Sequence, residues 1–355
     1  MKNLDKYLTL LDGEVDGLLL TSRYSRHYGA EFDIAEGVAI VTKKGCRYFT
    51  DSRYIESAEN GIRGFEVLDI APVGYIQRMN DAIADFGITE LGFEEPFLTY
   101  AEYMDYEKNL NCRLVPRNAE INGFRGTKED WELELMRKAQ AITDKAFSEV
   151  IGRIKVGMTE LELQAELIYC LYKNGATGLA FDPIVVSGPN TSLPHGVAGE
   201  RVIREGDFIT MDYGASYMGY CSDMTRTVAV GYATEEMQTV YNTVLKAQLA
   251  GLAVSRAGVP GEAIDAAARD VITEAGYGPY FGHGYGHSLG LEIHESPSPN
   301  AKNPEPMPLY AVASAEPGIY LPGKFGVRIE DTCVYLEDGI EILTASPKEL
   351  IVVPG

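Results

Sequence analysis

Histidines are concentrated in one part of the chain. The sequence has five, and four of them lie between Pro194 and His294. Three fall within the glycine-rich segment from Gly282 to Glu295, where glycines allow the backbone to approach a buried group closely. Ser296 and Pro297 follow, so the segment is not an H-E-x-x-H motif, and it is not a phosphate-binding loop. The alternative to a functional cluster is a flexible loop with incidental histidines. The three are His283, His287 and His294.

Two aspartates lie in or beside a segment that is otherwise apolar. Phe208 to Tyr213 predicts a buried strand that contains Asp212, and a reversal at Gly214 to Gly219 leads on to Asp223. We expect Asp212 and Asp223 to lie opposite each other on paired strands. Burying a carboxylate costs free energy unless something compensates its charge. The alternative is an aspartate that caps a turn.

A second pair of carboxylates lies near the end of the chain. Glu316 and Glu330 stand on either side of a turn expected at Pro322-Gly323. Side chains alternate along an extended strand, so Arg328 and Glu330 share one face. The alternative is that Arg328 and Glu330 form a surface ion pair.

These clusters together predict a metal centre. Four carboxylates that converge without cations would repel one another, and their pKa values would rise. Two divalent ions remove the repulsion, and carboxylates that bridge ions about 3.5–4 Å apart commonly activate a water for hydrolysis. Four oxygen ligands with one imidazole suit manganese, cobalt, iron or zinc, and they favour the harder ions. The carboxylates are Asp212, Asp223, Glu316 and Glu330.

The part of the chain before these clusters, residues 1–122, predicts a small α/β domain. Lys43 to Gly45 is expected to be the turn of a hairpin, and the apolar spacing from Tyr75 to Phe86 predicts a helix. His27 is the only histidine here, and we expect it to be structural. The expected strands are Val15 to Thr21, Gly37 to Thr42, Arg47 to Asp51 and Leu91 to Phe93.

Residues 123–355 predict a second domain built from two similar halves. A short glycine-containing stretch from Asn122 to Gly126 marks the boundary. Each half has two helices followed by strand-like segments, which predicts a pseudo-symmetric domain with a shared sheet and a cleft between the halves. The helices are expected from about residue 127 to 147, 159 to 171, 235 to 254 and 262 to 275, and the strand-like segments from 184 to 230 and 288 to 353.

The overall composition restricts the function. The chain is 45% hydrophobic and carries a formal net charge of −21, which argues against nucleic acid or an anionic membrane as a partner. We find no apolar run long enough for a transmembrane helix and no signal peptide. The five cysteines form no C-x-x-C pair and predict reduced thiols in a cytoplasmic protein.

Six short motifs between residues 193 and 331 resemble, in their order along the chain, those of the pita-bread metallopeptidases. This family includes Xaa-Pro aminopeptidase, prolidase and methionine aminopeptidase. The resemblance covers roughly residues 125 to 355. It implies an α+β fold, in which a pita-bread domain with pseudo-twofold helix-helix-strand halves (residues 123–355) follows a creatinase-like N-terminal α/β domain (residues 1–122). Minimal methionine aminopeptidases lack that first domain. The motifs are Leu193–Gly196, Met211–Gly214, Ser222–Thr227, Gly282–Glu295, Ala315–Tyr320 and Val327–Asp331.

The resemblance also implies roles for individual residues. The implied metal ligands are Asp212 on one ion, Asp223 and Glu330 between the ions, and His287 and Glu316 on the second ion. The implied catalytic residues are His195 and His294, which contact substrate and intermediate, and Glu316, which moves a proton. The implied residues of the proline pocket are His283, Tyr320 and Arg328. Thr225 is expected to hydrogen-bond a ligand carboxylate.

The implied activity is that of a dinuclear exopeptidase. A hydroxide between two divalent ions, with manganese favoured and cobalt, zinc or iron as alternatives, would cleave the Xaa-Pro bond at the N-terminus of short proline-containing peptides. A homodimer is expected. The alternatives are removal of methionine, a metal-free creatinase-like amidinohydrolase and a non-catalytic binding module. The sequence leaves open the preferred peptide length and first residue.

Overall fold

The computed structural model describes residues 3–11 and 13–355, and the chain divides into two compact units. The first unit extends to Phe124, and the second runs from Arg125 to Gly355. The boundary expected after residue 122 falls near the end of helix α6 (Asn118–Gly123). No described helix is both long and apolar enough to cross a membrane.

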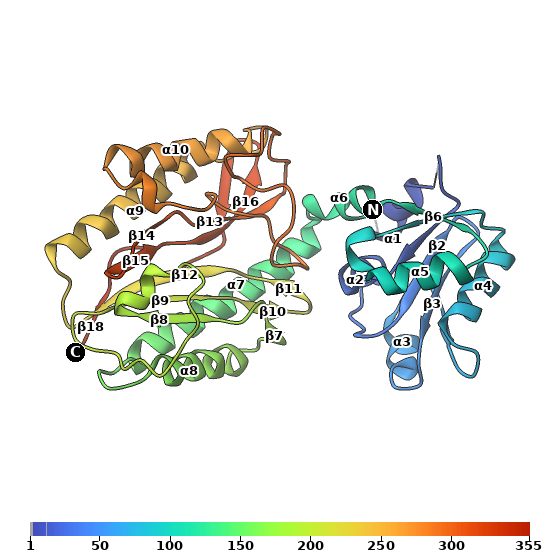
Figure 1. The fold of residues 1–355 in the computed structure, drawn as a ribbon, viewed down its shortest axis with the longest axis horizontal. Helices are drawn as coiled ribbons and strands as arrows, with labels where there is room; N and C mark the ends of the chain where they lie inside the picture. The colour runs from blue at the N-terminus through green and yellow to red at the C-terminus, as the bar shows by residue number, and fades with distance from the viewer. Residues whose placement is uncertain (1–2, 12) are drawn as a thin grey trace. The chain divides into compact units, whose positions relative to one another are not determined.

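The first unit contains a six-stranded mixed sheet in the order β4-β3-β2-β1-β5-β6 (Figure 1). The hairpin predicted around Lys43 to Gly45 joins β2 to β3, which pair antiparallel. The central strand β1 pairs antiparallel with β2 and parallel with β5. The strands are β1 (Gly17–Leu20), β2 (Val38–Thr42), β3 (Gly45–Thr50), β4 (Glu66–Asp69), β5 (Glu90–Phe93) and β6 (Arg113–Pro116).

Helices pack against this sheet and complete the core of the first unit. The helix predicted from Tyr75 to Phe86 is α4, and its buried Met79, Ala82 and Ile83 contact the apolar strand residues. His27 is buried in α2, which supports a structural role. The other helices are α1 (Asn3–Thr9), α2 (Arg23–Ala30), α3 (Ile55–Gly61), the 3₁₀ turn Glu95–Phe97 and α5 (Tyr100–Asn109); the 3₁₀ turn Phe124–Gly126 follows α6.

The first half of the second unit packs two helices against a sheet in the order β18-β12-β9-β8. Thr159 begins α8 with a capping box: its hydroxyl accepts from the N–H of Glu162, whose carboxylate accepts from the N–H of Thr159. The elements are α7 (Asp130–Val150), the 3₁₀ turn Ile151–Arg153, α8 (Glu160–Lys173), β7 (Gly178–Leu179), β8 (Ile184–Ser187), the 3₁₀ turn Gly188–Ser192, β9 (Phe208–Tyr213), β10 (Ala215–Tyr217), β11 (Tyr220–Cys221) and β12 (Met224–Val230).

The second half repeats this arrangement, with its helices on the opposite side of the strands (Figure 1). The turn predicted at Pro322-Gly323 joins β14 to β15. The elements are α9 (Glu235–Val254), α10 (Gly261–Glu274), the 3₁₀ turn Gly278–Tyr280, β13 (Val312–Ala315), β14 (Gly318–Leu321), β15 (Phe325–Arg328), β16 (Asp331–Leu336), β17 (Gly339–Ile342) and β18 (Val352–Val353).

Two sequence expectations about the strands were wrong. The halves do not share one sheet: β13-β16-β17 and β14-β15 form sheets of their own, and only β18 returns to the sheet of the first half. The region from residue 288 to 311 is not strand-like. It contains only isolated bridges, among them Ser288 with Glu295, because its glycines and prolines interrupt regular pairing.

A buried ion pair connects the two halves near the cleft. The Arg226 guanidinium on β12 lies 2.8 Å from the Asp331 carboxylate on β16, and both side chains are buried. Arg226 also donates to the carbonyl oxygen of Ser346, and Lys348 forms a second ion pair with Asp331. The segment that precedes β18 is therefore attached to both halves.

Replacing Asp331 with asparagine tests how much this ion pair contributes to the stability of the protein. The change leaves two cations without their anion, and removing one partner of a buried pair typically costs about 3–5 kcal/mol. We expect urea denaturation to show a fall of that size in the free energy of unfolding. The control Lys324→Ala breaks an exposed ion pair with Glu236 and should cost about 1 kcal/mol or less. An Asp331→Asn variant as stable as this control would contradict the assignment.

Candidate metal centre

Strands β9 and β12 supply two carboxylates to a common cavity. Asp212 lies within β9, and Asp223 immediately precedes β12. The two aspartates are not opposite each other, as the sequence suggested, because the register pairs Asp212 with Thr225. The intervening β10-β11 hairpin sets this offset. Asp212 therefore does not cap a turn, and both carboxylates line the same cavity.

The other two carboxylates come from the second half. Glu316 lies between β13 and β14, and Glu330 lies between β15 and β16. The pairing of Ala315 with Asp331, and of Gly318 with Arg328, brings these two connections together. The surface ion pair considered for Arg328 and Glu330 is excluded, because the two residues are only 4% and 1% exposed.

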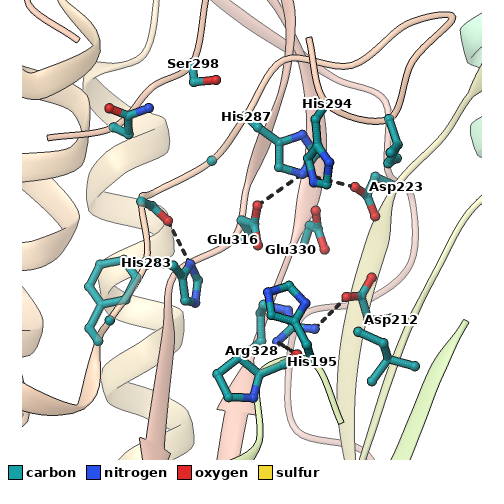
Figure 2. Close-up of a pocket in the computed structure, with 18 of the residues that line it drawn as sticks. His195, Asp212, Asp223, His283, His287, His294, Ser298, Glu316, Arg328 and Glu330 are labelled. Atoms are coloured by element: carbon teal, nitrogen blue, oxygen red, sulfur yellow. Dashed lines mark hydrogen bonds and ion pairs between the residues drawn. The ribbon is translucent and has the colours of Figure 1, made fainter. Parts of the chain in front are cut away.

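The structure places all ten candidate site residues around one cavity of about 810 Å³. Figure 2 labels all of them except Tyr320. The cavity lies within the second unit and opens between its two halves. The ten residues are His195, Asp212, Asp223, His283, His287, His294, Glu316, Tyr320, Arg328 and Glu330.

His287 lies between two of the carboxylates, those of Asp223 and Glu316. Its Nε2 is 3.4 Å from Asp223 Oδ2 and 3.3 Å from Glu316 Oε1 (Figure 2). One ligand atom from each of Asp223, His287 and Glu330 lies within 4.8 Å of the other two. These residues come from three distant parts of the chain, so the fold itself gathers them.

The carboxylates of the cluster are poorly placed to carry charge without cations. Burial raises the pKa of Asp223 to about 7; its hydrogen bond with His287 opposes the rise, and the charge of Asp212 adds to it. Burial raises the pKa of Glu330 well above its usual range, and repulsion from Asp223 and Glu316 adds to that rise. Burial also raises the pKa of Asp212, against the effect of Arg328. Burial thus disfavours the charged form of each carboxylate, and a cation bound beside them would favour it.

Three carboxylate oxygens at this centre are buried without a hydrogen-bond partner. They are Asp212 Oδ1, Asp223 Oδ1 and Glu330 Oε1. A buried polar atom normally has a partner, and leaving a carboxylate oxygen without one costs free energy. Divalent cations accept this combination of carboxylate oxygens and an imidazole nitrogen. The residues therefore fit a metal centre.

Hydrogen bonds hold the remaining carboxylate oxygens in place. Thr225 Oγ1 donates to Glu330 Oε2 at 2.6 Å, so the hydrogen bond expected from Thr225 to a ligand carboxylate is present. Arg328 donates to Asp212 Oδ2 at 2.6 Å and to the hydroxyl of Tyr320 at 2.8 Å. Glu330 and Asp212 thus each keep one oxygen fixed, while the other oxygen has no hydrogen-bond partner.

The histidine segment packs closely against its neighbours in the site, which favours a functional cluster over incidental histidines. Gly286 is required there, because a Cβ would lie 2.0 Å from the carbonyl oxygen of Ser314. The His294 ring packs 4.4 Å from the His287 ring. His283 Nε2 lies 2.9 Å from the hydroxyl of Tyr320 on another wall of the cavity. His195 reaches the cavity from the loop that follows the 3₁₀ turn Gly188–Ser192.

Sequence reasoning missed a clamp that fixes the start of this segment. Asp265 on α10 accepts from the N–H of Tyr285 at 2.8 Å and forms an ion pair with Arg269. Arg269 donates to the carbonyl oxygens of Phe281 and His283. The signal was present: Asp265 lies on the apolar face of the helix, four residues before an arginine.

Comparison with known proteins identifies the family. Residues 134–337 match metallopeptidase family M24, and residues 3–126 match the creatinase/prolidase N-terminal domain. The chain therefore belongs to metallopeptidase family M24, and it is a hydrolase that acts on peptide bonds with divalent metal ions. The family resemblance and the fold class predicted from the sequence are confirmed.

Several relatives cover nearly the whole chain. The uncharacterized peptidase YqhT of Bacillus subtilis is 40% identical over 339 residues, which cover 95% of this chain and 96% of that protein. The Xaa-Pro dipeptidase of Pyrococcus horikoshii is 34% identical over 355 residues and 99% of both chains. The structure of an Xaa-Pro dipeptidase from Bacillus anthracis matches with a TM-score of 0.95, 41% identity and 99% coverage of both chains. That of an X-Pro aminopeptidase from Thermotoga maritima matches with a TM-score of 0.92, 36% identity and 99% coverage of both.

Replacing Glu330 with glutamine should separate charge repulsion from metal binding. The variant replaces a carboxyl whose ionisation the site disfavours with a neutral amide, so the metal-free protein should gain stability at neutral pH, by about 1–3 kcal/mol. Manganese should stabilise the wild type but not the variant, because the variant lacks a ligand. Thermal unfolding of chelator-treated protein, with and without added manganese, measures both effects.

The exposed substitution Glu274→Gln is the control for Glu330→Gln and should change neither value. A metal-free Glu330→Gln variant less stable than the metal-free wild type would contradict the repulsion argument. Full stabilisation of the variant by manganese would contradict the role of Glu330 as a ligand.

Proposed function

We propose that this chain is an Xaa-Pro-specific exopeptidase, an aminopeptidase or dipeptidase, that works with two divalent ions. The observation that carries the proposal is the convergence of three unpartnered, buried carboxylate oxygens beside His287 in one cavity. The names of the relatives from Pyrococcus horikoshii and Bacillus anthracis support the specificity for a bond to proline.

The residues that would hold the ions follow from the geometry and the resemblance. By resemblance, Asp212 would hold one ion, His287 and Glu316 would hold the other, and Asp223 and Glu330 would contribute to both. A set of four carboxylates and one imidazole favours manganese, with cobalt, zinc or iron as alternatives. When bound, the ions supply an activated water and polarise the substrate carbonyl.

Glu316 is placed to move the proton of the reaction. Its Oε1 accepts from the hydroxyl of Ser314 at 3.0 Å, which fixes the carboxylate next to His287. Glu316 takes a proton from the attacking water and passes it to the nitrogen of the leaving proline. General acid–base catalysis of this kind typically contributes about 10²–10⁴-fold.

Two histidines are placed to hold the substrate. Burial lowers the pKa of His294, which favours the neutral form of the ring. A neutral imidazole keeps one N–H, which His294 offers to the carbonyl oxygen as negative charge develops on it. His195 contacts the substrate backbone from the opposite side of the cavity (Figure 2).

The specificity for proline is assigned to the wall that carries His283. Its ring packs edge-on against Phe281 at 5.1 Å and hydrogen-bonds Tyr320, which in turn accepts from Arg328. This chain of contacts makes a rigid, partly aromatic surface for a pyrrolidine ring. The N-terminal unit argues against methionine removal, because minimal methionine aminopeptidases lack such a domain.

The remaining assignments rest on the resemblance and on composition. We assign residues 1–122 to a creatinase-like N-terminal domain and residues 123–355 to the catalytic domain, a division supported by the compact units that meet after Phe124. The five cysteines are free thiols, which supports a reducing, cytoplasmic location. A homodimer remains an expectation from the resemblance.

The proposed activity is tested with a length series of peptides. Manganese-loaded protein should cleave Xaa-Pro dipeptides and Xaa-Pro-Yaa tripeptides, while matched Xaa-Ala and Met-Ala peptides should be cleaved at least about tenfold more slowly, a difference of about 1.4 kcal/mol in the barrier. Chelation should abolish cleavage. Full activity after rigorous metal removal, or equal rates with alanine and proline peptides, would contradict the proposal.

The same assay tests the role of Glu316. Glu316→Gln removes the proton acceptor but keeps the shape of the side chain, so kcat should fall by about 10²–10⁴-fold, with a smaller change in KM. The exposed substitution Glu305→Gln is the control and should leave kcat unchanged. A kcat within threefold of the wild type would remove Glu316 from the mechanism.

A further inference from the structure

The loop between His287 and His294 is closed by the residue that follows it. The N–H of Glu295 donates to the carbonyl oxygen of Ser288 at 2.7 Å, and these two residues form a bridge. His287 directly precedes Ser288, and His294 directly precedes Glu295, so each histidine is next to one of the two bridged residues. The separation of the two rings depends on how this loop is held.

The side chain of Glu295 is held by a cation from the start of the second unit. Lys128 Nζ lies 2.8 Å from Glu295 Oε2, and the two side chains are each only 2% exposed. Lys128 is itself fixed, because its Nζ donates to the carbonyl oxygen of Arg125 at 2.6 Å and its backbone N–H donates to Tyr310. Arg125 lies 3.5 Å from the other carboxylate oxygen of Glu295.

The loop is folded tightly around the same carboxylate. Glu295 Oε1 accepts from the N–H of Glu292 at 3.2 Å. A Cβ on Gly290 would lie 2.7 Å from Glu295 Oε2, so a larger residue there would have to displace the carboxylate. The Glu295 carboxylate therefore contacts both the backbone of the loop, at Glu292, and the ammonium group of Lys128.

We propose that Glu295, held by Lys128, is a positioning residue that fixes His294 against His287. It contacts neither the substrate nor, by our assignment, the metal ions; it acts through the loop. The proposal rests on the proposed function only for the role of His294. The alternative, a buried ion pair that merely stabilises the fold, makes a different prediction, because neutral residues of similar size often replace such pairs without loss of stability.

The double variant Lys128→Met/Glu295→Gln separates the two possibilities. It removes the charges of Lys128 and Glu295 together, and Arg125 keeps its ion pair with Glu292, so the thermal midpoint should stay near that of the wild type. Without the ion pair, amide hydrogen exchange in residues 288–295 should accelerate. The kcat for Xaa-Pro cleavage should fall by about 10- to 100-fold, the range typical of residues that orient metal-site groups. The exposed double variant Lys324→Met/Glu236→Gln is the matched control.

The variant Gly290→Ala tests the same contact while keeping every charge. Its Cβ should displace the Glu295 carboxylate, accelerate exchange in residues 288–295 and lower kcat. Exchange and kcat within twofold of the wild type, in both the double variant and Gly290→Ala, would overturn the proposal. A wild type that cleaves no Xaa-Pro peptide would instead overturn the proposed function, and the exchange measurements would still decide whether Glu295 positions the loop.

Discussion

The four carboxylates of the cavity need cations to offset their charge, and the positions of the surrounding strands and loops follow from bringing these carboxylates together. Three of the carboxylates each have one oxygen in contact with a neighbouring side chain and one oxygen without a partner. The contacts join Asp212 to Arg328, Asp223 to His287 and Glu330 to Thr225. Burial and mutual repulsion raise the pKa of all three. A protein gains nothing in stability from such a cluster, so its presence points to function.

The two-halved fold brings the carboxylates together from distant parts of the sequence. The first half supplies two of them from β9 and β12, and the second supplies two more from the connections around β14 and β15. The ion pair of Arg226 with Asp331 connects the halves beside the site. Three of the histidines reach the cavity on one segment, Gly282–Glu295, whose start is held by Asp265 and whose end is held by the ion pair of Glu295 with Lys128.

The local sequence pattern was enough to predict most elements and to single out four carboxylates as candidate ligands, while the roles of the individual site residues came from the family resemblance. The helices α4 and α9 have the predicted bounds because apolar spacing and an N-cap or glycine define them locally. The candidate ligands were found because carboxylates in apolar strands are costly without compensation. The offset between Asp212 and Asp223 could not be predicted, since it depends on the β10-β11 hairpin. The role of Lys128 could not be predicted either, because its partner Glu295 lies 167 residues away in the sequence.

The central claim is that five side chains share one pair of cations. Crystals grown with manganese, measured at its absorption edge, test this most directly through the anomalous signal. The account predicts two peaks per chain, both between Asp212, Asp223, His287, Glu316 and Glu330, with Glu330 in contact with both. No peak there, or a single peak that excludes Asp212 or Glu316 at saturating manganese, would contradict it.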